Sequence, residues 1–213
     1  MAGIYVHCHI IFKGGIIMNK ENEWIEKIKR KECMLYDIPE EEITIKIAEV
    51  AWDTIHDERA LKYFNYDTDD DINTNIELCF SIMNEWYGTP FKYLPDKIKD
   101  KYLCLRAVYQ SKGILRLIPE EIRNNNYDIC QKAVDRCASD IIYVTNKKFI
   151  ENGLGILAVS KDGTLLRYIP EDLKSNIIVF NAIQQTANAM AYIPNRLRNI
   201  PIKDIFSGRF LDN

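Results

Sequence analysis

The sequence predicts an all-α fold made of stacked short helical repeats, an α-solenoid-like array, with an N-terminal helical cap. Three observations predict it. An apolar-proline-acidic run recurs about every 25 residues, the apolar residues between recurrences follow helical spacing, and helix-capping residues precede these stretches. We expect an N-terminal tail over residues 1–17, the helical cap over 18–66, the repeats over 67–200 and a C-terminal tail over 201–213.

The recurring run has four clear copies: YLPDKIKD, LIPEEIRN, YIPEDLKS and YIPNRLRN. A degenerate fifth copy, YVTNKKFIEN, has Thr145 in place of the proline. The apolar residue before the proline serves as an anchor for alignment. Successive anchors are 24, 26, 25 and 24 residues apart, and they are Leu94, Ile118, Val144, Ile169 and Ile193.

Three further apolar columns align with the anchors, and they predict the faces that helices bury. Eleven residues before the anchors are Met83, Ala107, Ala133, Ala158 and Ala182. Ten residues before them are Asn84, Val108, Val134, Val159 and Ile183, and three residues before them are Phe91, Leu115, Ile141, Leu166 and Met190. The small alanine side chains allow a neighbouring helix to approach closely. A unit of this size cannot bury its own apolar face, so three or more units must stack.

Polar residues and glycines predict where the helix of each unit begins and ends. Eighteen residues before three of the anchors stand residues that cap helix N-termini, namely Asp100, Asn126 and Ser175, and Asn75 and Asn152 lie one position away from the same column. A helix of about eleven residues follows, for example over 127–138. Near its end we expect a left-handed residue at Gly88, Gly113 and Gly163, with Asn188 in that role in the last copy.

The proline of each copy begins or kinks a second helical piece, and the pattern fits both geometries. The acidic residues after it favour the positive end of that piece. Residues 20–66 also look helical, and Ile38-Pro39-Glu40 repeats the signature there. This segment is either a divergent copy or an N-terminal cap. The polar run NRLRNIPIKD after Ile193 is expected to close the other end.

The pattern resembles an uncharacterised family of short helical repeats found in bacterial and large-virus proteins. The residues that carry the resemblance are the apolar-Pro-acidic-x-Ile/Leu-Arg/Lys run and the small-apolar pair in the helix. They stand here as residues 118–123 with Ala133-Val134, and as residues 169–174 with Ala182-Ile183. The resemblance covers about residues 75–199, while residues 18–66 match it poorly. It implies the fold and no assigned activity.

Composition and charge exclude several function classes. The chain of 213 residues is 47% apolar and 28% charged, with a formal net charge of −3, which does not favour a nucleic-acid binder. No apolar run is long enough to span a bilayer, and the first residues lack the features of a signal peptide. Residues 1–17 are an extension before a natural start at Met18, or a mobile tail. The six cysteines show no CxxC spacing, so we expect reduced thiols in a cytoplasmic protein or in one delivered into a host cell.

Candidate metal sites are weak. The acidic cluster Asp67–Asp71 could supply Ca²⁺ ligands, but an EF-hand loop needs Gly at position six and Glu at position twelve, where Ile72 and Leu78 stand. A solvated helix-capping linker is the expected structure. His7 and His9 alternate around Cys8 and would share one side of a strand, yet no third ligand is near. We therefore predict no metal-binding residues.

Catalytic and nucleotide-binding motifs are also lacking. His56 lies in a predicted helix and is expected to be partly exposed. Gly153 and Gly155 lack the third glycine of a dinucleotide fingerprint, and neither a G-x-S-x-G motif nor a phosphate loop is present. The short basic runs KIKRKE and RLRN are expected to face solvent. We predict no catalytic or cofactor-binding residues. The three tryptophans, Trp24, Trp52 and Trp86, are expected in the core, or as binding hot spots if exposed.

A stacked repeat fold presents extended surfaces that bind proteins, so the sequence predicts a protein-interaction module without catalytic activity. The partner-binding residues are not predicted. Frequent Ile, Asn, Lys and Tyr have AT-rich codons, which points to a low-GC bacterium, a phage or a large DNA virus as the source. Inhibitor, immunity protein and effector are therefore the candidate roles. The alternatives are an enzyme with a carboxylate-based site and a nucleic-acid-binding repeat protein.

Overall fold

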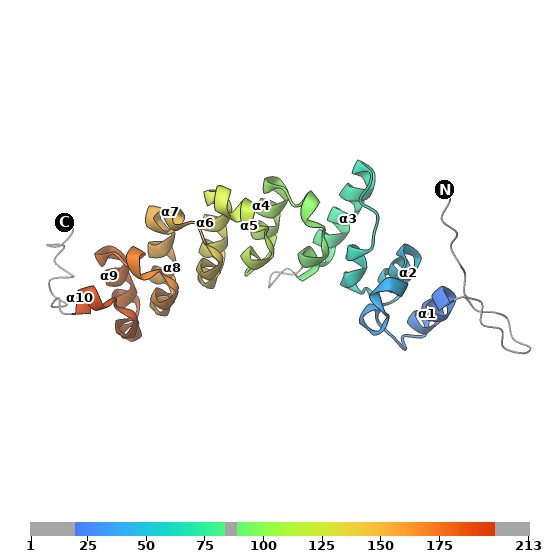
Figure 1. Ribbon diagram of the computed structural model, residues 1–213, viewed down its shortest axis with the longest axis horizontal. Helices are drawn as coiled ribbons and strands as arrows, with labels where there is room; N and C mark the ends of the chain where they lie inside the picture. The colour runs from blue at the N-terminus through green and yellow to red at the C-terminus, as the bar shows by residue number, and fades with distance from the viewer. Residues whose placement is uncertain (1–19, 84–88, 199–213) are drawn as a thin grey trace, which may run out of the picture. The chain divides into compact units, whose positions relative to one another are not determined.

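The computed structural model describes residues 20–83 and 89–198 (Figure 1). Within these ranges the chain is all-helical and contains no β-strand, as the sequence predicts. It divides into two compact units, unit 1 (Met1–Cys79) and unit 2 (Phe80–Asn213). The division lies inside helix α3 (Asp69–Ile82).

Unit 1 has a core formed by two helices and three short 3₁₀ helices. In chain order they are α1 (Lys20–Lys29), η1 (Leu35–Asp37), η2 (Glu40–Glu42), α2 (Ile45–Ile55) and η3 (Glu58–Lys62). Their buried apolar side chains form one cluster that includes Ile28, Leu35, Ile38, Ile47 and Ala51. The expected helical character of residues 20–66 is therefore confirmed.

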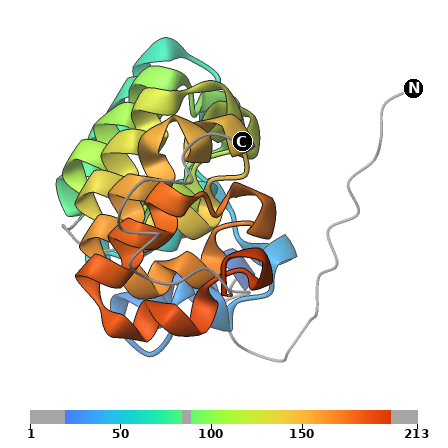
Figure 2. The same cartoon turned by 90° about the vertical axis from the view of Figure 1, so that its left-hand side faces the viewer.

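The described part of unit 2, apart from the end of α3, has four longer helices separated by shorter helical turns. The longer ones are α4 (Lys101–Gln110), α6 (Tyr127–Arg136), α8 (Gly155–Lys161) and α9 (Asn176–Gln185). Consecutive members of this set pack against one another, and Figure 2 shows them one behind another from orange-red to green. The shorter elements are η4 (Thr89–Tyr93), η5 (Asp96–Ile98), η6 (Leu115–Leu117), α5 (Glu120–Asn125), η7 (Ala138–Tyr143), α7 (Lys147–Phe149), η8 (Ile150–Leu154), η9 (Gly163–Tyr168), η10 (Glu171–Leu173), η11 (Ala187–Tyr192) and α10 (Asn195–Arg198).

The prolines of the recurring run begin the helical turns that follow them and kink none. Pro95, Pro119 and Pro170 each occupy the N-cap position, with φ between −59° and −51° and ψ between 140° and 141°. Ile118 and Ile169, which precede Pro119 and Pro170, have extended backbone, as expected next to a proline ring, with Ile118 at φ −85° and ψ 132°. Each segment thus has three helical pieces rather than the two that the sequence suggested, because a 3₁₀ helix separates the long helix from the proline.

The predicted apolar columns form the core of unit 2. All five anchors are buried, and so are the small residues eleven positions before them. The column three positions before the anchors is buried in its first four members, while Met190 is 43% exposed and Ala189 is buried instead. Asn84 lies outside the described residues. The helical period therefore places these side chains correctly except at the end of the series.

The predicted N-caps are right at two positions and wrong at three. The side chains of Asp100 and Ser175 accept hydrogen bonds from the main-chain N–H groups of Leu103 and Ile178. Asn126 occupies the N-cap position of α6, but its side-chain amide donates to the carbonyl of Ile122 at 2.8 Å and caps nothing.

The other two predicted caps, Asn75 and Asn152, lie inside helical segments. Asn75 lies within α3 and donates to the carbonyl of Asn65. Asn152 lies within η8, and Asn146 caps α7 in its place. Helices thus begin six or seven residues earlier than the cap column predicted at these two places.

The four long helices of unit 2 share the same C-terminal geometry, which the glycine pattern did not predict. The residue after α4, α6, α8 and α9 has extended backbone, and its N–H donates to the carbonyl of the column alanine: Ser111 to Ala107, Cys137 to Ala133, Asp162 to Ala158 and Thr186 to Ala182, at 2.8–3.0 Å. Gly113 has the expected positive φ of 67°. Gly163 and Asn188 do not have positive φ, so the left-handed prediction is wrong for both. Gly88 lies outside the described residues.

Gly163 has a packing role instead. A Cβ atom added there would lie 2.2 Å from the carbonyl oxygen of Ala182, far inside any allowed contact. The main chain at the start of η9 therefore touches the main chain of α9. Only glycine permits this approach, which explains the residue without any unusual dihedral angle.

In unit 2, hydrogen bonds join basic side chains to main-chain carbonyls that lie 18–25 positions away in the sequence. The Arg123 guanidinium donates to the Tyr143 carbonyl at 2.7 Å, and the Lys174 ammonium donates to the Tyr192 carbonyl at 3.1 Å. Both carbonyls belong to the residue before an anchor. The Arg196 guanidinium donates to the carbonyls of Glu171 and Lys174. The second of the two basic runs, RLRN, is therefore not simply solvated, because Arg196 binds main-chain oxygens of the preceding segment.

The described cysteines are free thiols, and Cys33, Cys79, Cys104 and Cys130 are buried while Cys137 is half-buried. Burial raises the pKa of both Cys104 and Cys130 to about 12, which keeps these thiols protonated. Cys8 lies outside the described residues. In the part of the chain that the structure describes, no helix has both the length and the apolar character needed to cross a bilayer.

Candidate functional site

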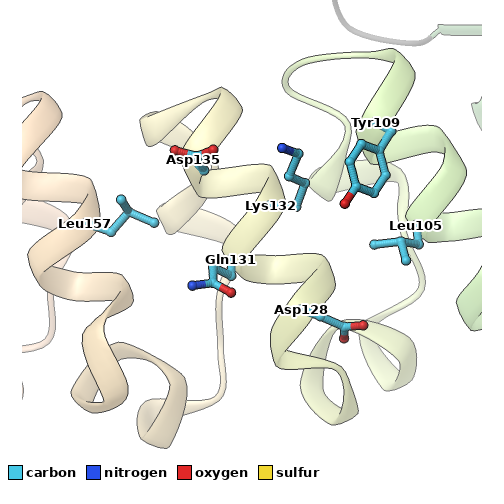
Figure 3. A pocket seen from close by; sticks show the side chains of 7 residues that line it. All are labelled: Leu105, Tyr109, Asp128, Gln131, Lys132, Asp135 and Leu157. Carbon is cyan, nitrogen blue, oxygen red and sulfur yellow. The ribbon is translucent and has the colours of Figure 1, made fainter.

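A shallow hollow of about 350 Å³ lies on the helical surface of unit 2 (Figure 3). We call this surface the outer face. Three successive long helices supply its side chains, and Figure 3 shows Gln131 and Lys132 of α6 between the α4 and α8 side chains. The lining residues are Leu105, Tyr109, Asp128, Gln131, Lys132, Asp135 and Leu157.

The outer face exists because α4 carries apolar residues on both of its sides. Leu103, Cys104, Ala107 and Val108 are buried and fill the core. Tyr102, Leu105 and Tyr109 follow one another at spacings of three and four, so they share the opposite side of the helix. Tyr102 is 78% exposed and Tyr109 is 58% exposed. Exposed tyrosines have a large apolar body and a polar tip, which is the composition of protein-binding hot spots.

Charged groups on the outer face are paired within the protein. The Lys101 ammonium lies 3.0 Å from an Asp128 carboxylate oxygen. The Lys161 ammonium lies 2.9 Å from an Asp135 carboxylate oxygen, and this hydrogen bond lowers the pKa of Asp135 below its usual value. The Lys132 ammonium lies 4.9 Å from the centre of the Tyr109 ring, within the range of a cation–π contact. Each of these three lysines is therefore already engaged by a carboxylate or an aromatic ring of the protein.

A second hollow, of about 370 Å³, lies beside the 3₁₀ helices η6 and η7. Its lining includes Arg116, Cys137, Ser139 and Asp140. Asp140 is only 2% exposed, and burial raises the pKa of its carboxyl to about 7, although the Leu115 N–H, 3.5 Å away, and the Arg116 charge act in the opposite direction. In unit 1 the buried Asp57 carboxylate accepts from the Leu35 N–H at 3.1 Å. Leu35 and Leu115 both stand three residues before an Ile-Pro pair, so the two aspartates have the same structural role.

The acidic cluster Asp67–Asp71 forms the start of α3. Thr68 caps this helix, because its hydroxyl oxygen accepts from the Asp71 N–H at 3.1 Å and its hydroxyl donates to the Asp71 carboxylate at 2.7 Å. The cluster is therefore at a helix start, as expected, but Asp69–Asp71 belong to the first turn of α3 and do not form a linker before it. Among the described residues no three His, Cys, Asp or Glu side chains meet in a geometry that could hold a metal ion.

The remaining candidates have structural positions. His56 is exposed and ends α2 in a left-handed conformation with φ 53°. Gly153 has φ 118° inside the kinked segment η8, and Gly155 packs against Ile178 of α9. His7, Cys8, His9 and Trp86 lie outside the described residues.

The two described tryptophans belong to unit 1. Trp24 and Trp52 are half-buried and pack against the unit 1 core. The indole N–H of Trp24 donates to a Glu42 carboxylate oxygen at 2.8 Å. Neither tryptophan contributes to the outer face, so the apolar anchors of that face are the tyrosines of α4.

Sequence reasoning missed two groups of residues. The tyrosines of α4 were overlooked because an apolar helical residue is first expected in the core. Their signal was available, since Tyr102, Leu105 and Tyr109 form a second apolar line on the side of the helix opposite the buried one. The basic residue that ends the recurring run was also not interpreted. In two segments this residue is Arg123 or Lys174, and its side chain donates a hydrogen bond to the next segment. A basic residue recurs five positions after the anchor in the sequence, so the signal was present there.

Comparison with known proteins gives one family match. Residues 156–198 match a family model described as "Domain of unknown function (DUF4116)", and this segment covers most of α8 together with α9 and α10. No curated protein matches the chain. No solved structure matches it either.

Proposed function

We propose that the protein is a non-catalytic protein-interaction module that binds its partner through the outer face of unit 2. One observation carries the proposal: Tyr102 and Tyr109 project from α4 into solvent beside a hollow lined by Leu105 and Leu157. Aromatic side chains that remain 78% and 58% exposed on a regular helix gain little from folding. They gain contact area and hydrogen bonds when a partner covers them.

Two features support a protein partner over the alternatives. The charges of the outer face alternate in sign and pair with one another, whereas a nucleic-acid surface presents a basic stripe. Asp140 is a buried carboxyl whose pKa is raised to about 7, but it accepts a hydrogen bond from main chain, and Asp57 does the same in unit 1. This equivalence supports a structural role for Asp140 over a catalytic one.

The same proposal includes the stacked-repeat architecture. The equivalent alanine carbonyls, the equivalent prolines and the equivalent bonds from Arg123 to Tyr143 and from Lys174 to Tyr192 support an α-solenoid-like array of related segments. We extend it to residues 38–57. There Ile38 is buried, Pro39 begins a 3₁₀ turn, and the Thr44 hydroxyl caps α2, as the Asp100 carboxylate caps α4. These matches support a divergent copy rather than an unrelated cap.

The biological setting is part of the proposal as well. We assign the chain to the uncharacterised short-repeat family of bacterial and large-virus proteins, on the signature residues 118–123 and 169–174. Buried free thiols support a reducing compartment, either the cytoplasm of the source or that of a host cell. An inhibitor, immunity protein or effector that acts by covering its target fits a module of this kind.

Position-specific photo-crosslinking tests the function. A photoreactive amino acid replaces Tyr109 in the full chain, and the matched control carries it at Ile142, which is 43% exposed on η7 and does not line the outer-face hollow. We expect one cellular protein to crosslink from position 109 and not from position 142. The captured protein is then purified, and Tyr109→Ala is expected to weaken its binding at least tenfold.

Equal crosslinking from both positions, or none from position 109, contradicts binding through the outer face. Tyr109 is exposed, so its replacement is expected to leave the fold intact. If the melting temperature of Tyr109→Ala stays within about 2 °C of the wild-type value, its weaker binding is not caused by unfolding.

A further inference from the structure

We infer that Asn152 is a site of spontaneous deamidation in the folded protein, and that the Tyr127 hydroxyl slows the reaction. Asn152-Gly153 is the one Asn-Gly pair in the sequence. Asparagine is among the thermolabile residues of proteins, and a following glycine has no Cβ to hinder attack by its main-chain nitrogen. The site lies on η8 and shares no residue with the outer-face hollow, so it is separate from the proposed partner-binding surface.

The reaction consumes one water molecule and releases ammonia. The main-chain nitrogen of Gly153 attacks Cγ of Asn152, so that an N–Cγ bond forms while the Cγ–Nδ2 bond breaks. Ammonia leaves with the proton of the Gly153 N–H group. Water then opens the five-membered imide, giving a hydroxyl group to one of the two carbonyl carbons and a proton to the nitrogen. Cleavage at Cγ gives aspartate, and cleavage at the main-chain carbonyl carbon gives isoaspartate.

Asn152 has the freedom that ring closure needs. Its side chain is exposed, and its amide group makes no hydrogen bond to any residue that the structure describes. The main chain here is not helical, with Asn152 at φ −75° and ψ 15° and Gly153 at φ 118°. Among the described atoms, a Cβ added at Gly153 would meet the Tyr127 hydroxyl oxygen at an ordinary 3.8 Å. Packing therefore leaves room for the Gly153 nitrogen to approach the Asn152 side chain.

The Asp162-Gly163 pair, which could form the same imide, is held in place. The Asp162 carboxylate accepts from the Thr164 N–H at 2.9 Å and from the Thr164 hydroxyl at 2.6 Å. The Gly163 N–H donates to the side-chain amide oxygen of Gln185 at 2.7 Å. A Cβ added at Gly163 would lie 2.2 Å from the Ala182 carbonyl oxygen. Ring closure here would break these bonds and separate η9 from α9, so the fold protects this pair.

The Tyr127 hydroxyl restrains Asn152 from the main-chain side. It donates to the Asn152 carbonyl at 3.1 Å. At ψ 15° the Gly153 nitrogen lies away from the Asn152 side chain, so ring closure requires rotation about the Cα–C bond of Asn152. That rotation carries the carbonyl oxygen away from Tyr127 and breaks the hydrogen bond. The loss of one hydrogen bond corresponds to a factor of about three to ten in the rate.

The test places two Asn-Gly pairs in one molecule. Asp162→Asn creates the same dipeptide at position 162, where the new amide oxygen can still accept from the Thr164 N–H. The purified full chain is incubated at neutral and at mildly alkaline pH. Peptide mass spectrometry measures the replacement of –NH₂ by –OH at each position. Each event also adds one negative charge to a chain with a formal net charge of −3, so ion-exchange chromatography separates the product.

We expect position 152 to deamidate at least about tenfold faster than position 162 in the folded protein, because only position 162 must open locally first. Both rates should rise with pH, since the attacking nitrogen has to lose its proton. In guanidinium chloride the two rates should agree within about threefold, because unfolding removes the structural difference. Asn152→Gln should abolish the signal at position 152, since its longer side chain cannot form the five-membered ring.

Tyr127→Phe tests the restraint. It removes the hydroxyl and keeps the ring, which lies edge-on to Phe149 at a centroid distance of 5.3 Å. Deamidation at position 152 should become about three to ten times faster. The matched control is Tyr168→Phe, because Tyr168 is 49% exposed on η9, and it should leave this rate unchanged.

An intact position 152 in the folded chain, when the denatured chain reacts, would overturn the inference. Equal rates at positions 152 and 162 before unfolding would overturn it too. An unchanged rate in Tyr127→Phe, or an equal rise in Tyr168→Phe, would remove the role of the hydroxyl. Circular dichroism checks the fold of each variant. If Asp162→Asn does not fold, the wild type decides, and a native rate at Asn152 more than about a hundredfold below the denatured rate contradicts a reactive site.

Discussion

The Arg123 guanidinium donates a hydrogen bond of 2.7 Å to the main-chain carbonyl of Tyr143, twenty residues further along the chain. Arg123 ends the recurring run of one segment, and Tyr143 stands directly before the anchor of the next. The Lys174 ammonium makes the equivalent bond to Tyr192. The basic residue of the sequence signature therefore joins one segment to the next, which gives the signature a physical reason.

Replacing Arg123 by Ala is expected to lower the free energy of unfolding by about 2–3 kcal/mol. The change removes a charged donor and leaves a main-chain carbonyl without its partner. Urea denaturation measures the effect. The control is Arg167→Ala, because Arg167 is exposed and stacks over the Tyr168 ring, and it should cost less than about 0.5 kcal/mol. Equal losses in the two variants would contradict a specific role for the Tyr143 bond.

Asp140 should make stability depend on pH between about 4 and 7. Burial raises the pKa of its carboxyl from 3.8 to about 7, so the folded protein binds a proton that the unfolded chain releases in this range. The Asp140 contribution is therefore fully present below pH 4 and is lost as the pH rises through 7. Denaturation at a series of pH values should show a shallower fall from pH 5 to pH 8 in Asp140→Asn than in the wild type.

Asn at position 140 still accepts from the Leu115 N–H and does not titrate, which makes it the suitable replacement. Asp135→Asn serves as the control. The pKa of Asp135 is lowered by Lys161, so its removal cannot flatten the profile between pH 5 and pH 8. An unchanged slope in Asp140→Asn would show that other groups cause the pH dependence.

Gly163→Ala is expected to cost at least about 3 kcal/mol. The new Cβ would lie 2.2 Å from the Ala182 carbonyl oxygen, and two main chains would have to separate. Gly155→Ala is the matched control, because its nearest neighbour at 2.9 Å is the end of the flexible Ile178 side chain. Thermal unfolding of both variants compares them. A smaller loss for Gly163→Ala than for Gly155→Ala would contradict the close approach of η9 and α9.

Ile118→Asp should unfold unit 2, while Glu120→Ala should change the free energy of unfolding by less than about 0.5 kcal/mol. Ile118 is 2% exposed, and a buried carboxylate without a partner costs more than a small domain can tolerate. Glu120 is exposed and accepts only weak hydrogen bonds, from Asn124 at 3.4 Å and Thr145 at 3.3 Å. Circular dichroism of the two variants distinguishes these outcomes. A folded Ile118→Asp variant would contradict the conclusion that the core of unit 2 depends on the buried anchors.

Much of the fold could be predicted because burial follows helical spacing directly. The five anchors and the alanine column are all buried, as their period requires. Cap chemistry was less predictable, because an asparagine side chain can satisfy either an N–H or a carbonyl. Asn126 donates to the Ile122 carbonyl, and the sequence contains nothing that excludes this choice. Gly163 shows the same ambiguity, since glycine serves a positive φ and a close approach equally well.

The candidate site was not predictable to the same extent. Tyr102 and Tyr109 have the composition of core residues, and only the packing of α4 shows which of its two apolar sides is covered. The burial of Asp140 depends on the packing of η7 against η6. Asp140 lies 25 positions after Leu115 in the sequence, and the two residues meet only in the folded protein. Contacts between distant residues determine such features, whereas local spacing determines the core.

The hydrogen bonds that join one segment to the next also bear on how such a chain can change length during evolution. A duplication or deletion of one whole segment would place Arg123, Lys174 and Arg196 opposite equivalent carbonyls again. An insertion of a few residues inside α6 would change the spacing between Arg123 and Tyr143, and one inside α9 would change the spacing between Lys174 and Tyr192. Homologous proteins are therefore expected to differ in length by multiples of about 25 residues, with smaller insertions confined to their ends.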